Sequence, residues 1–310
     1  MLQALSSASH GDDGYRDDQT TIALEQFMAS LTGKEAGLFV TSGTMGNQVS
    51  LRALQAQSPY SILCDHRSHI LNAEAGGVAV LCGAMVSGVV PGNGIYLTVE
   101  DVKKNVMISK NVHSCPTKII SLENTLAGTI MPLEEVRKIS AFAKEHGIKM
   151  HLDGARLWEA VAAGAGSLTD YAEYFDSLTM CFTKGLGAPF GSIIVGSKEF
   201  VTQSRWVRQM IGGGMRQSGI LAAAARVAVE EQFGRGPYGD GGGLRKTHER
   251  ARGVAKTWTE KGGKLAQAVD TNMVWLNLPE ANISKAEFVK LAREAGVRLN
   301  GGRVVIHYRE

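Results

Sequence analysis

Apolar residues along this chain fall into short runs separated by stretches with helical spacing. In residues 132–145 the apolar side chains recur every three or four positions, which places them on one face of a helix that begins near Pro132. These side chains are Leu133, Val136, Ile139 and Phe142. The short apolar runs have the length of buried strands and lie at 37–40, 62–64, 78–85, 119–122, 148–152, 178–182 and 192–195. Strands that alternate with helices predict an α/β fold, in which helices cover both faces of a mostly parallel sheet.

A glycine-rich tract at residues 233–243 separates this long pattern from a shorter one. After the tract come a charged helix, a strand, a second helix and a final strand at 303–307. We therefore expect a large domain at 1–235, with residues 1–17 as an N-terminal arm. A small α+β domain is expected at 236–310.

The composition says little about the fold but limits the kinds of partner that the protein can have. With 44% apolar and 20% charged residues over 310 positions, the chain resembles an ordinary globular protein. Its net charge is only +3, which gives no sign of a nucleic-acid or membrane partner. No apolar stretch approaches the roughly 20 residues that a membrane span needs. Four widely spaced cysteines are typical of reduced thiols, so we expect a cytoplasmic protein.

An aspartate and a lysine follow two neighbouring apolar runs. Asp153 ends the run at 148–152, and Lys184 follows the run at 178–182 just before two glycines. A buried carboxylate is costly without a cationic partner, and a buried lysine has no packing purpose. Pyridoxal phosphate satisfies both, because its aldehyde reacts with a lysine amine and a carboxylate can hold its ring nitrogen protonated. The pair therefore predicts a pyridoxal-phosphate enzyme.

The segment 41–47 joins a predicted strand to a predicted helix. Backbone N–H groups at such a helix start attract anions, and Ser42 and Thr44 add hydroxyl donors. This arrangement suits the phosphate of the cofactor. The same residue types also cap helices that bind nothing, so the segment alone leaves both interpretations open.

Histidines and arginines supply further candidates. His69 and His113 could stack on a cofactor ring or act as a general base. Arg156 and Arg303 could clamp a carboxylate. A metal pair of His151 with the aspartate two positions later lacks a third ligand at a convincing spacing, so we expect no metal site.

Together these residues resemble the L-threonine aldolase family of fold-type I pyridoxal-phosphate enzymes, within the beta-eliminating lyase/threonine aldolase superfamily. The resemblance covers nearly the whole chain in the correct order. It rests on GDD at 11–13, LTGKEA at 31–36, SGTM at 42–45, EAGG at 74–77, SLENT at 121–125, HLDGAR at 151–156, TKGLG at 183–187, GGGMRQS at 212–218 and DTNM at 270–273.

The resemblance implies roles for the cofactor site. Lys184 would form the Schiff base with the cofactor, Asp153 would hold the pyridine nitrogen, and His69 would stack on the ring. Further cofactor contacts would come from Ser42, Gly43, Thr44 and Arg156.

The resemblance also implies a substrate site and an assembly. Arg156 and Arg303 would hold the substrate carboxylate, with His113 near its hydroxyl and Asn124 beside it. The catalytic group would comprise Lys184, Asp153 and the two histidines. The loop at 212–216 resembles one that reaches a neighbouring subunit, which implies a homotetramer built from dimers.

The implied activity is retro-aldol cleavage of L-threonine, L-allo-threonine and related β-hydroxy-α-amino acids to glycine and an aldehyde. Such a lyase serves threonine catabolism and glycine biosynthesis. The threo, allo or aryl preference is left open by the sequence, because it depends on side chains around Cβ.

The chain departs from the family at both ends. The usual N-terminal strand with Arg-Ser-Asp-Thr and the usual C-terminal helix are missing, which suggests a truncated or shortened product. A targeting segment could be missing with them. Two alternatives therefore stay open, an alanine racemase on the same scaffold and an inactive paralogue.

Overall fold

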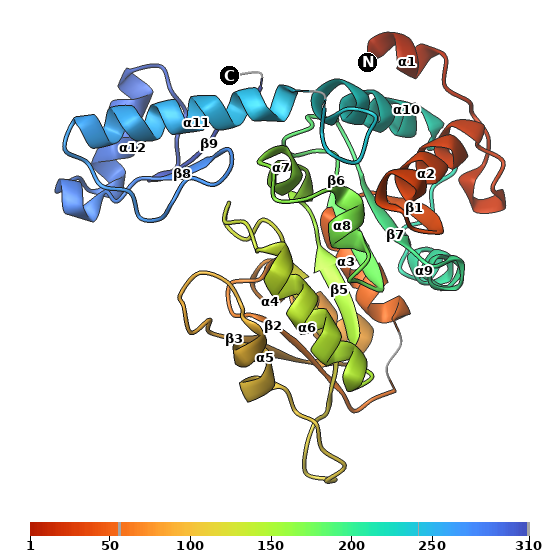
Figure 1. Cartoon of the computed structure of the whole chain (residues 1–310). Coiled ribbons are helices and arrows are strands. Elements are labelled where there is room, and N and C mark those ends of the chain that lie inside the picture. Colours follow the sequence, from red (N-terminus) through yellow and green to blue (C-terminus); the bar gives the residue numbers. More distant parts are fainter. Residues whose placement is uncertain (55–56, 241, 309–310) are drawn as a thin grey trace.

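The computed structural model describes residues 1–54, 57–240 and 242–308 and is built around a seven-stranded sheet (Figure 1). The sheet order is β1-β7-β6-β5-β4-β2-β3. Strands β2 to β6 pair in parallel, whereas β7 runs antiparallel to β1 and β6. The strands are β1 (Ala36–Val40), β2 (Ser61–Asp65), β3 (Met85–Val89), β4 (Thr117–Glu123), β5 (Lys149–Asp153), β6 (Ser177–Cys181) and β7 (Ser192–Gly196). The predicted α/β fold with a mostly parallel sheet is confirmed.

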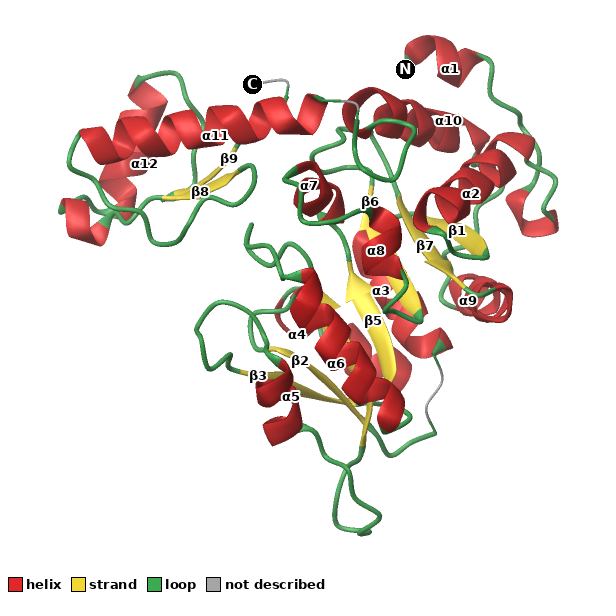
Figure 2. Cartoon of the chain, viewed as in Figure 1, coloured by secondary structure: helices red, strands yellow, loops and turns green. Residues whose placement is uncertain are grey.

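Helices lie on both sides of this sheet (Figure 2). The α-helices up to residue 228 are α1 (Leu2–Ser6), α2 (Gln19–Thr32), α3 (Gly43–Ala53), α4 (His69–Asn72), α5 (Val99–Asn105), α6 (Leu133–Glu145), α7 (Leu157–Ala162), α8 (Leu168–Ala172), α9 (Lys198–Met210) and α10 (Gly219–Ala228). The predicted helix at 132–145 is confirmed as α6, with Pro132 as its N-cap residue. Helix α1 in the predicted arm packs against α10.

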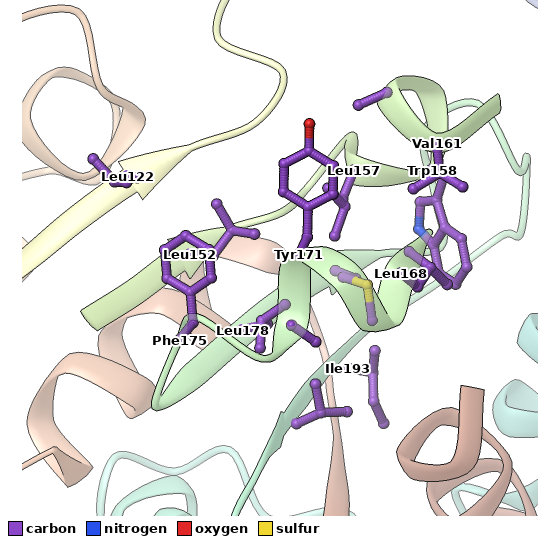
Figure 3. Close-up of a cluster of buried hydrophobic side chains, with 14 of the residues drawn as sticks. Leu122, Leu152, Leu157, Trp158, Val161, Leu168, Tyr171, Phe175, Leu178 and Ile193 are labelled. Carbon is purple, nitrogen blue, oxygen red and sulfur yellow. The ribbon is translucent and has the colours of Figure 1, made fainter. Parts of the chain in front are cut away.

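Consecutive side chains on the strands belong to two different hydrophobic cores. Leu63 and Ile120 belong to a large core that also contains buried side chains of α2, α6 and α8. Ile62 and Ile119, one position earlier on the same strands, join a second core with residues of α3. Figure 3 shows part of the large core, including Tyr171 of α8. Burial of both faces explains why the strands appear as continuous apolar runs rather than as alternating patterns.

The last described elements lie apart from the large sheet (Figure 1). They are α11 (Gly243–Glu260), α12 (Lys285–Glu294) and a two-stranded antiparallel sheet of β8 (Met273–Trp275) and β9 (Arg303–Val305). This small sheet agrees with the expected α+β unit, although the boundary at residue 236 stays a prediction. Gly241 of the glycine-rich tract lies outside the described residues.

One predicted strand is wrong. The apolar run at 78–85 forms a helical turn over Val78–Cys82, and β3 begins only at Met85. The turn ends at Gly83, whose φ of 63° is in the left-handed region. An apolar run of this length fits a buried helical turn as well as a strand, so the pattern could not separate them.

No helix in the described part of the chain combines the length and the apolar character needed to cross a membrane.

Candidate active site

A cavity of about 350 Å³ lies at the carboxyl ends of β5 and β6, beside the start of α3. Open parallel sheets commonly bind ligands at this edge. Its lining includes Ser42, Gly43, Thr44, His69, Asp153 and Lys184. The fold therefore brings together six of the residues singled out in the sequence, from four separate segments of the chain.

Asp153 is the last residue of β5 and is buried. Its Oδ2 accepts a hydrogen bond from Asn47 Nδ2 at 2.7 Å, and its Oδ1 accepts one from the Ala155 N–H at 3.0 Å. Both donors are neutral amides, which orient the carboxylate without compensating its charge. A buried carboxylate held this way is suited to a cationic ligand.

Lys184 lies in the loop that follows β6 and lines the same cavity. The loop closes through a hydrogen bond from the Gly187 N–H to the Lys184 carbonyl at 2.9 Å, and Gly187 has a φ of 68°. The next residue, Gly185, packs against Glu159, because a Cβ there would lie 2.0 Å from Oε1 of that side chain. The two glycines thus allow a tight turn that presents the lysine to the cavity.

The start of α3 forms another wall of the cavity. Ser42 caps the helix, since its hydroxyl oxygen accepts a hydrogen bond from the Met45 N–H at 3.1 Å. A Cβ on Gly43 would lie 2.6 Å from Cys181 Sγ, so the backbone packs directly against the end of β6. The capping interpretation of this segment is confirmed, and because the helix start also lines the cavity, its phosphate-binding role stays a prediction.

Asn47 and Glu74, for which the sequence predicted no role, link His69 to Asp153 by hydrogen bonds. Glu74 Oε1 accepts hydrogen bonds from Asn47 Nδ2 at 2.9 Å and pairs with His69 Nδ1 at 2.8 Å. Asn47 and Glu74 are both buried. The signal in the sequence was their place in two segments already singled out, since Asn47 ends the segment 41–47 and Glu74 begins EAGG.

His151 contacts the side chain of Asn47 and is itself held by Ser177. Its ring nitrogens contact Ser177 Oγ at 2.8 Å and Asn47 Oδ1 at 3.2 Å. Burial lowers the pKa of His151 to about 4, so the ring is neutral near pH 7. His151 and Asp153 both contact the side-chain amide of Asn47. His69, Glu74 and Asp153 do bring ligand atoms within 4.8 Å of one another, but these atoms are joined by the hydrogen bonds through Asn47.

Glu123 is a further titratable group that the sequence analysis missed. It pairs in register with Asp153 on the adjacent strand, and its Oε2 accepts a hydrogen bond from the His69 N–H at 2.9 Å. Burial, and after it the negative charge of Asp153, raises the pKa of Glu123 to about 8. The site thus contains a carboxyl group that can exchange a proton near neutral pH.

Arg156 and Arg303 come from different parts of the fold and are close enough to interact. Burial lowers the pKa of Arg156, and the positive charge of Arg303 on β9 is the next largest cause. Two cations that disfavour each other form a natural site for an anion. The guanidinium of Arg303 also lies 5.7 Å from the Trp275 ring.

Two predicted substrate residues do not reach this cavity. His113 is exposed and precedes the amino end of β4, whereas the cavity lies at the carboxyl ends of the strands. A seven-residue strand spans roughly 20 Å, so the strand separates His113 from the cavity of its own chain, and its role beside the substrate stays a prediction. Asn124 uses its side-chain amide to hold Met131, with its Oδ1 accepting from the Met131 N–H at 3.2 Å.

Comparison with known proteins identifies relatives over almost the whole chain. The model of the beta-eliminating lyase family matches residues 1–281. Aldolase vrtJ of Penicillium aethiopicum is 51% identical over 99% of this chain and 78% of its own length. Alanine racemase TOXG of Cochliobolus carbonum is 45% identical over 99% of this chain and 79% of its own. Low specificity L-threonine aldolase of Saccharomyces cerevisiae is 44% identical over 99% of this chain and 78% of its own length.

The fold has solved counterparts as well. Threonine aldolase of Leishmania major superposes with a TM-score of 0.79 at 20% sequence identity, over 100% of this chain and 92% of that one. The chain therefore has the fold-type I architecture of these enzymes.

Proposed function

The chain belongs to the beta-eliminating lyase family, and we propose that it cleaves L-threonine, L-allo-threonine and related β-hydroxy-α-amino acids to glycine and an aldehyde. It is a pyridoxal-phosphate-dependent lyase, related to threonine aldolases over nearly its whole length. The observation that carries the proposal is the cavity that Asp153 and Lys184 share with the start of α3.

The residues around the cavity fit the cofactor. Lys184 supplies the amine for the aldehyde, Asp153 the carboxylate for the ring nitrogen, and the start of α3 the N–H groups for the phosphate. His69 lies on the same cavity, where it can stack on the ring. The neutral donors that hold Asp153 leave its charge to be compensated by the protonated ring nitrogen. When bound, pyridoxal phosphate supplies a sink for the electron pair released at Cα.

The protein side chains then orient the substrate and move protons. Arg156 and Arg303 bind the substrate carboxylate, which fixes the direction of the Cα–Cβ bond. His69 accepts the proton of the β-hydroxyl as the Cα–Cβ bond breaks and the aldehyde leaves. His69 then gives this proton up to Cα, which completes glycine and restores the base. Such acid–base assistance contributes about 10²–10⁴-fold to the rate.

We also propose a homotetramer for this enzyme. Trp206 and Met210 of α9 are 74% and 63% exposed, and they precede the loop at 212–216 that would reach a neighbouring subunit. Large exposed apolar side chains of this kind are suited to a subunit interface.

We place the proposed enzyme in the cytoplasm. Its four cysteines are unpaired in the described structure, and three of them are buried, as expected for a reducing compartment. There it would act in threonine catabolism and glycine biosynthesis.

An alanine racemase is the second candidate, favoured by the 45% identity to the racemase TOXG. The same lysine and aspartate would serve both reactions, because each begins by loosening a bond at Cα. A racemase breaks the Cα–H bond, whereas an aldolase breaks Cα–Cβ. An inactive paralogue would carry out neither reaction.

The test incubates purified protein, supplied with pyridoxal phosphate, with L-threonine or with L-alanine. The proposal expects acetaldehyde and glycine in equal amounts from L-threonine, and far less D-alanine from L-alanine. Faster formation of D-alanine would favour the racemase. No product from either substrate would favour the inactive paralogue.

A further inference from the structure

We propose that Glu74 and Asn47 are positioning residues that tie His69 to Asp153 and fix the ring of His69 with its Nδ1–H toward Glu74. The Nε2 of His69 is then the nitrogen available to the β-hydroxyl of the substrate. This inference rests on the proposed aldolase reaction and adds to it the groups that prepare its base.

Glu74 determines which nitrogen of His69 carries the proton. Its side chain is fully buried, and its Oε1 lies 2.8 Å from His69 Nδ1. An ionised carboxylate can only accept hydrogen bonds, so Nδ1 must donate, which leaves Nε2 of the neutral ring as an acceptor. The other oxygen of Glu74 accepts a hydrogen bond from the side-chain amide of Gln48. The carboxylate is therefore held from both sides.

The backbone around His69 is fixed as well. His69 begins the short helix α4, and its N–H donates to Glu123 Oε2 at 2.9 Å. After this helix the chain turns back through Ala75 and Gly76, whose φ values are 52° and 73°. Ala75 is not a glycine, so its left-handed conformation is unfavourable in isolation. The turn sets Glu74 against the ring that lies five residues before it.

Asn47 connects this pair to Asp153. Its amide nitrogen has two hydrogens and donates one to Glu74 at 2.9 Å and one to Asp153 at 2.7 Å. His151 sets the orientation of the amide, because its Nε2 contacts the carbonyl oxygen of Asn47 at 3.2 Å. Neutral His151 donates there while its Nδ1 accepts from Ser177.

The amide of Asn47 thus separates two buried carboxylates that would otherwise repel each other. The two carboxylates have different partners. Glu74 holds the imidazole of His69, whereas Asp153 is directed at the cofactor. This arrangement follows the logic of a carboxylate that orients a histidine base by binding its other nitrogen.

The direct test is the protonation pattern of His69 in the holoenzyme. Nitrogen NMR of protein labelled with ¹⁵N-histidine distinguishes the two neutral forms of each ring, and His69→Asn identifies the signal. The proposal expects the Nδ1–H form in the wild type. An Nε2–H form in the wild type would overturn the proposal, whatever any variant does.

Variants then separate positioning from folding. Glu74→Gln keeps the shape of the side chain but can also donate a hydrogen bond, so we expect a mixture of the two forms. The kcat should fall about 10–100-fold, as for other residues that orient a functional histidine, with KM and cofactor affinity changed less than threefold. Glu74→Asp should recover part of the loss. An unchanged tautomer and kcat in Glu74→Gln would contradict the role of Glu74.

Asn47→Ala tests the other half of the connection. It should weaken cofactor binding about tenfold or more, because Asp153 loses its orienting donor, and this is measured by fluorescence titration of the cofactor-free protein. Unchanged affinity would contradict the role of Asn47.

Glu134→Gln makes the same chemical change as Glu74→Gln at an exposed position of α6 and serves as the control. If the wild type cleaves no β-hydroxy amino acid but shows the expected tautomer and affinities, the proposed function fails and the positioning roles remain.

Discussion

Asp153 and Lys184 follow adjacent parallel strands and line the same cavity, with Asp153 at the end of β5 and Lys184 in the loop after β6. The strands set this relationship, because parallel neighbours end at the same edge of a sheet. The two groups can therefore act on one ligand from different segments of the chain.

Replacing Asp153 with asparagine removes the charge while keeping an oxygen that can accept from Asn47. The ring nitrogen of the cofactor then loses its ionic partner, so we expect kcat to fall about 10²–10³-fold, the range seen when one electrostatic contact in an active site is removed. Steady-state kinetics on L-threonine check this. A variant with wild-type kcat and an unchanged unfolding temperature would show that the carboxylate has no such role.

Gly43→Ala is expected to weaken cofactor binding about tenfold or more. A Cβ there would lie 2.6 Å from Cys181 Sγ, so the start of α3 or the Cys181 side chain must shift, and both line the cavity. Titration of the cofactor-free variant with pyridoxal phosphate measures the effect.

Gly253→Ala in α11 is the matched control, because no atom lies within 4 Å of the added Cβ. It should leave binding unchanged and stabilise the helix by up to about 1 kcal/mol. Equal binding by both variants would contradict the close approach inferred at Gly43.

Glu123 predicts a specific dependence of stability on pH. Its pKa is raised from 4.5 to about 8, so the folded protein binds a proton that the unfolded chain releases above about pH 4.5. The favourable contribution is fully present below that pH and is lost as pH rises through about 8. Glu123→Gln mimics the protonated form, so the variant should gain unfolding temperature relative to the wild type between pH 5 and about 9.

Thermal unfolding of both cofactor-free proteins across this pH range gives the comparison. The predicted result is a difference that widens in favour of the variant as pH rises. A difference that stays constant with pH would show that Glu123 titrates normally in the folded protein.

The buried pair of His248 and Glu159 joins α11 to α7, next to the loop of Lys184. Its Nε2 and Oε2 atoms lie 2.7 Å apart, and both side chains are almost fully buried. His248→Ala leaves a buried carboxyl oxygen without its hydrogen-bond partner, so we expect a loss of about 1–3 kcal/mol in the free energy of unfolding, measured with urea.

Lys103→Ala breaks an exposed pair with Glu100 and provides the control for this measurement. Its effect should stay below about 1 kcal/mol, because exposed ion pairs contribute little. Similar losses in the two variants would show that burial of the His248 pair does not matter.

The sequence could predict those parts of the site whose chemistry is local. Asp153 and Lys184 stand out because each closes an apolar run, and the helix start at Gly43 follows from its glycine and hydroxyl pattern. The α/β fold follows from the alternation of apolar runs and helical spacing.

Other parts depend on contacts between distant segments. The bridge from Asn47 to Glu74 joins α3 to the turn after α4, which no spacing in the chain reveals. The distance of His113 from the cavity depends on the direction of β4, which the residues around His113 do not indicate. The run at 78–85 has no period that separates a strand from a helical turn.

The central claim is that Lys184 carries the cofactor, and reduction with borohydride tests it most directly. The holoenzyme is reduced, digested and analysed by mass spectrometry, with Lys184→Ala treated in parallel. We predict one modified peptide, with the reduced pyridoxyl phosphate group on Lys184, and no specific modification in the variant. Modification of a different lysine in the wild type, or of none, would contradict the account.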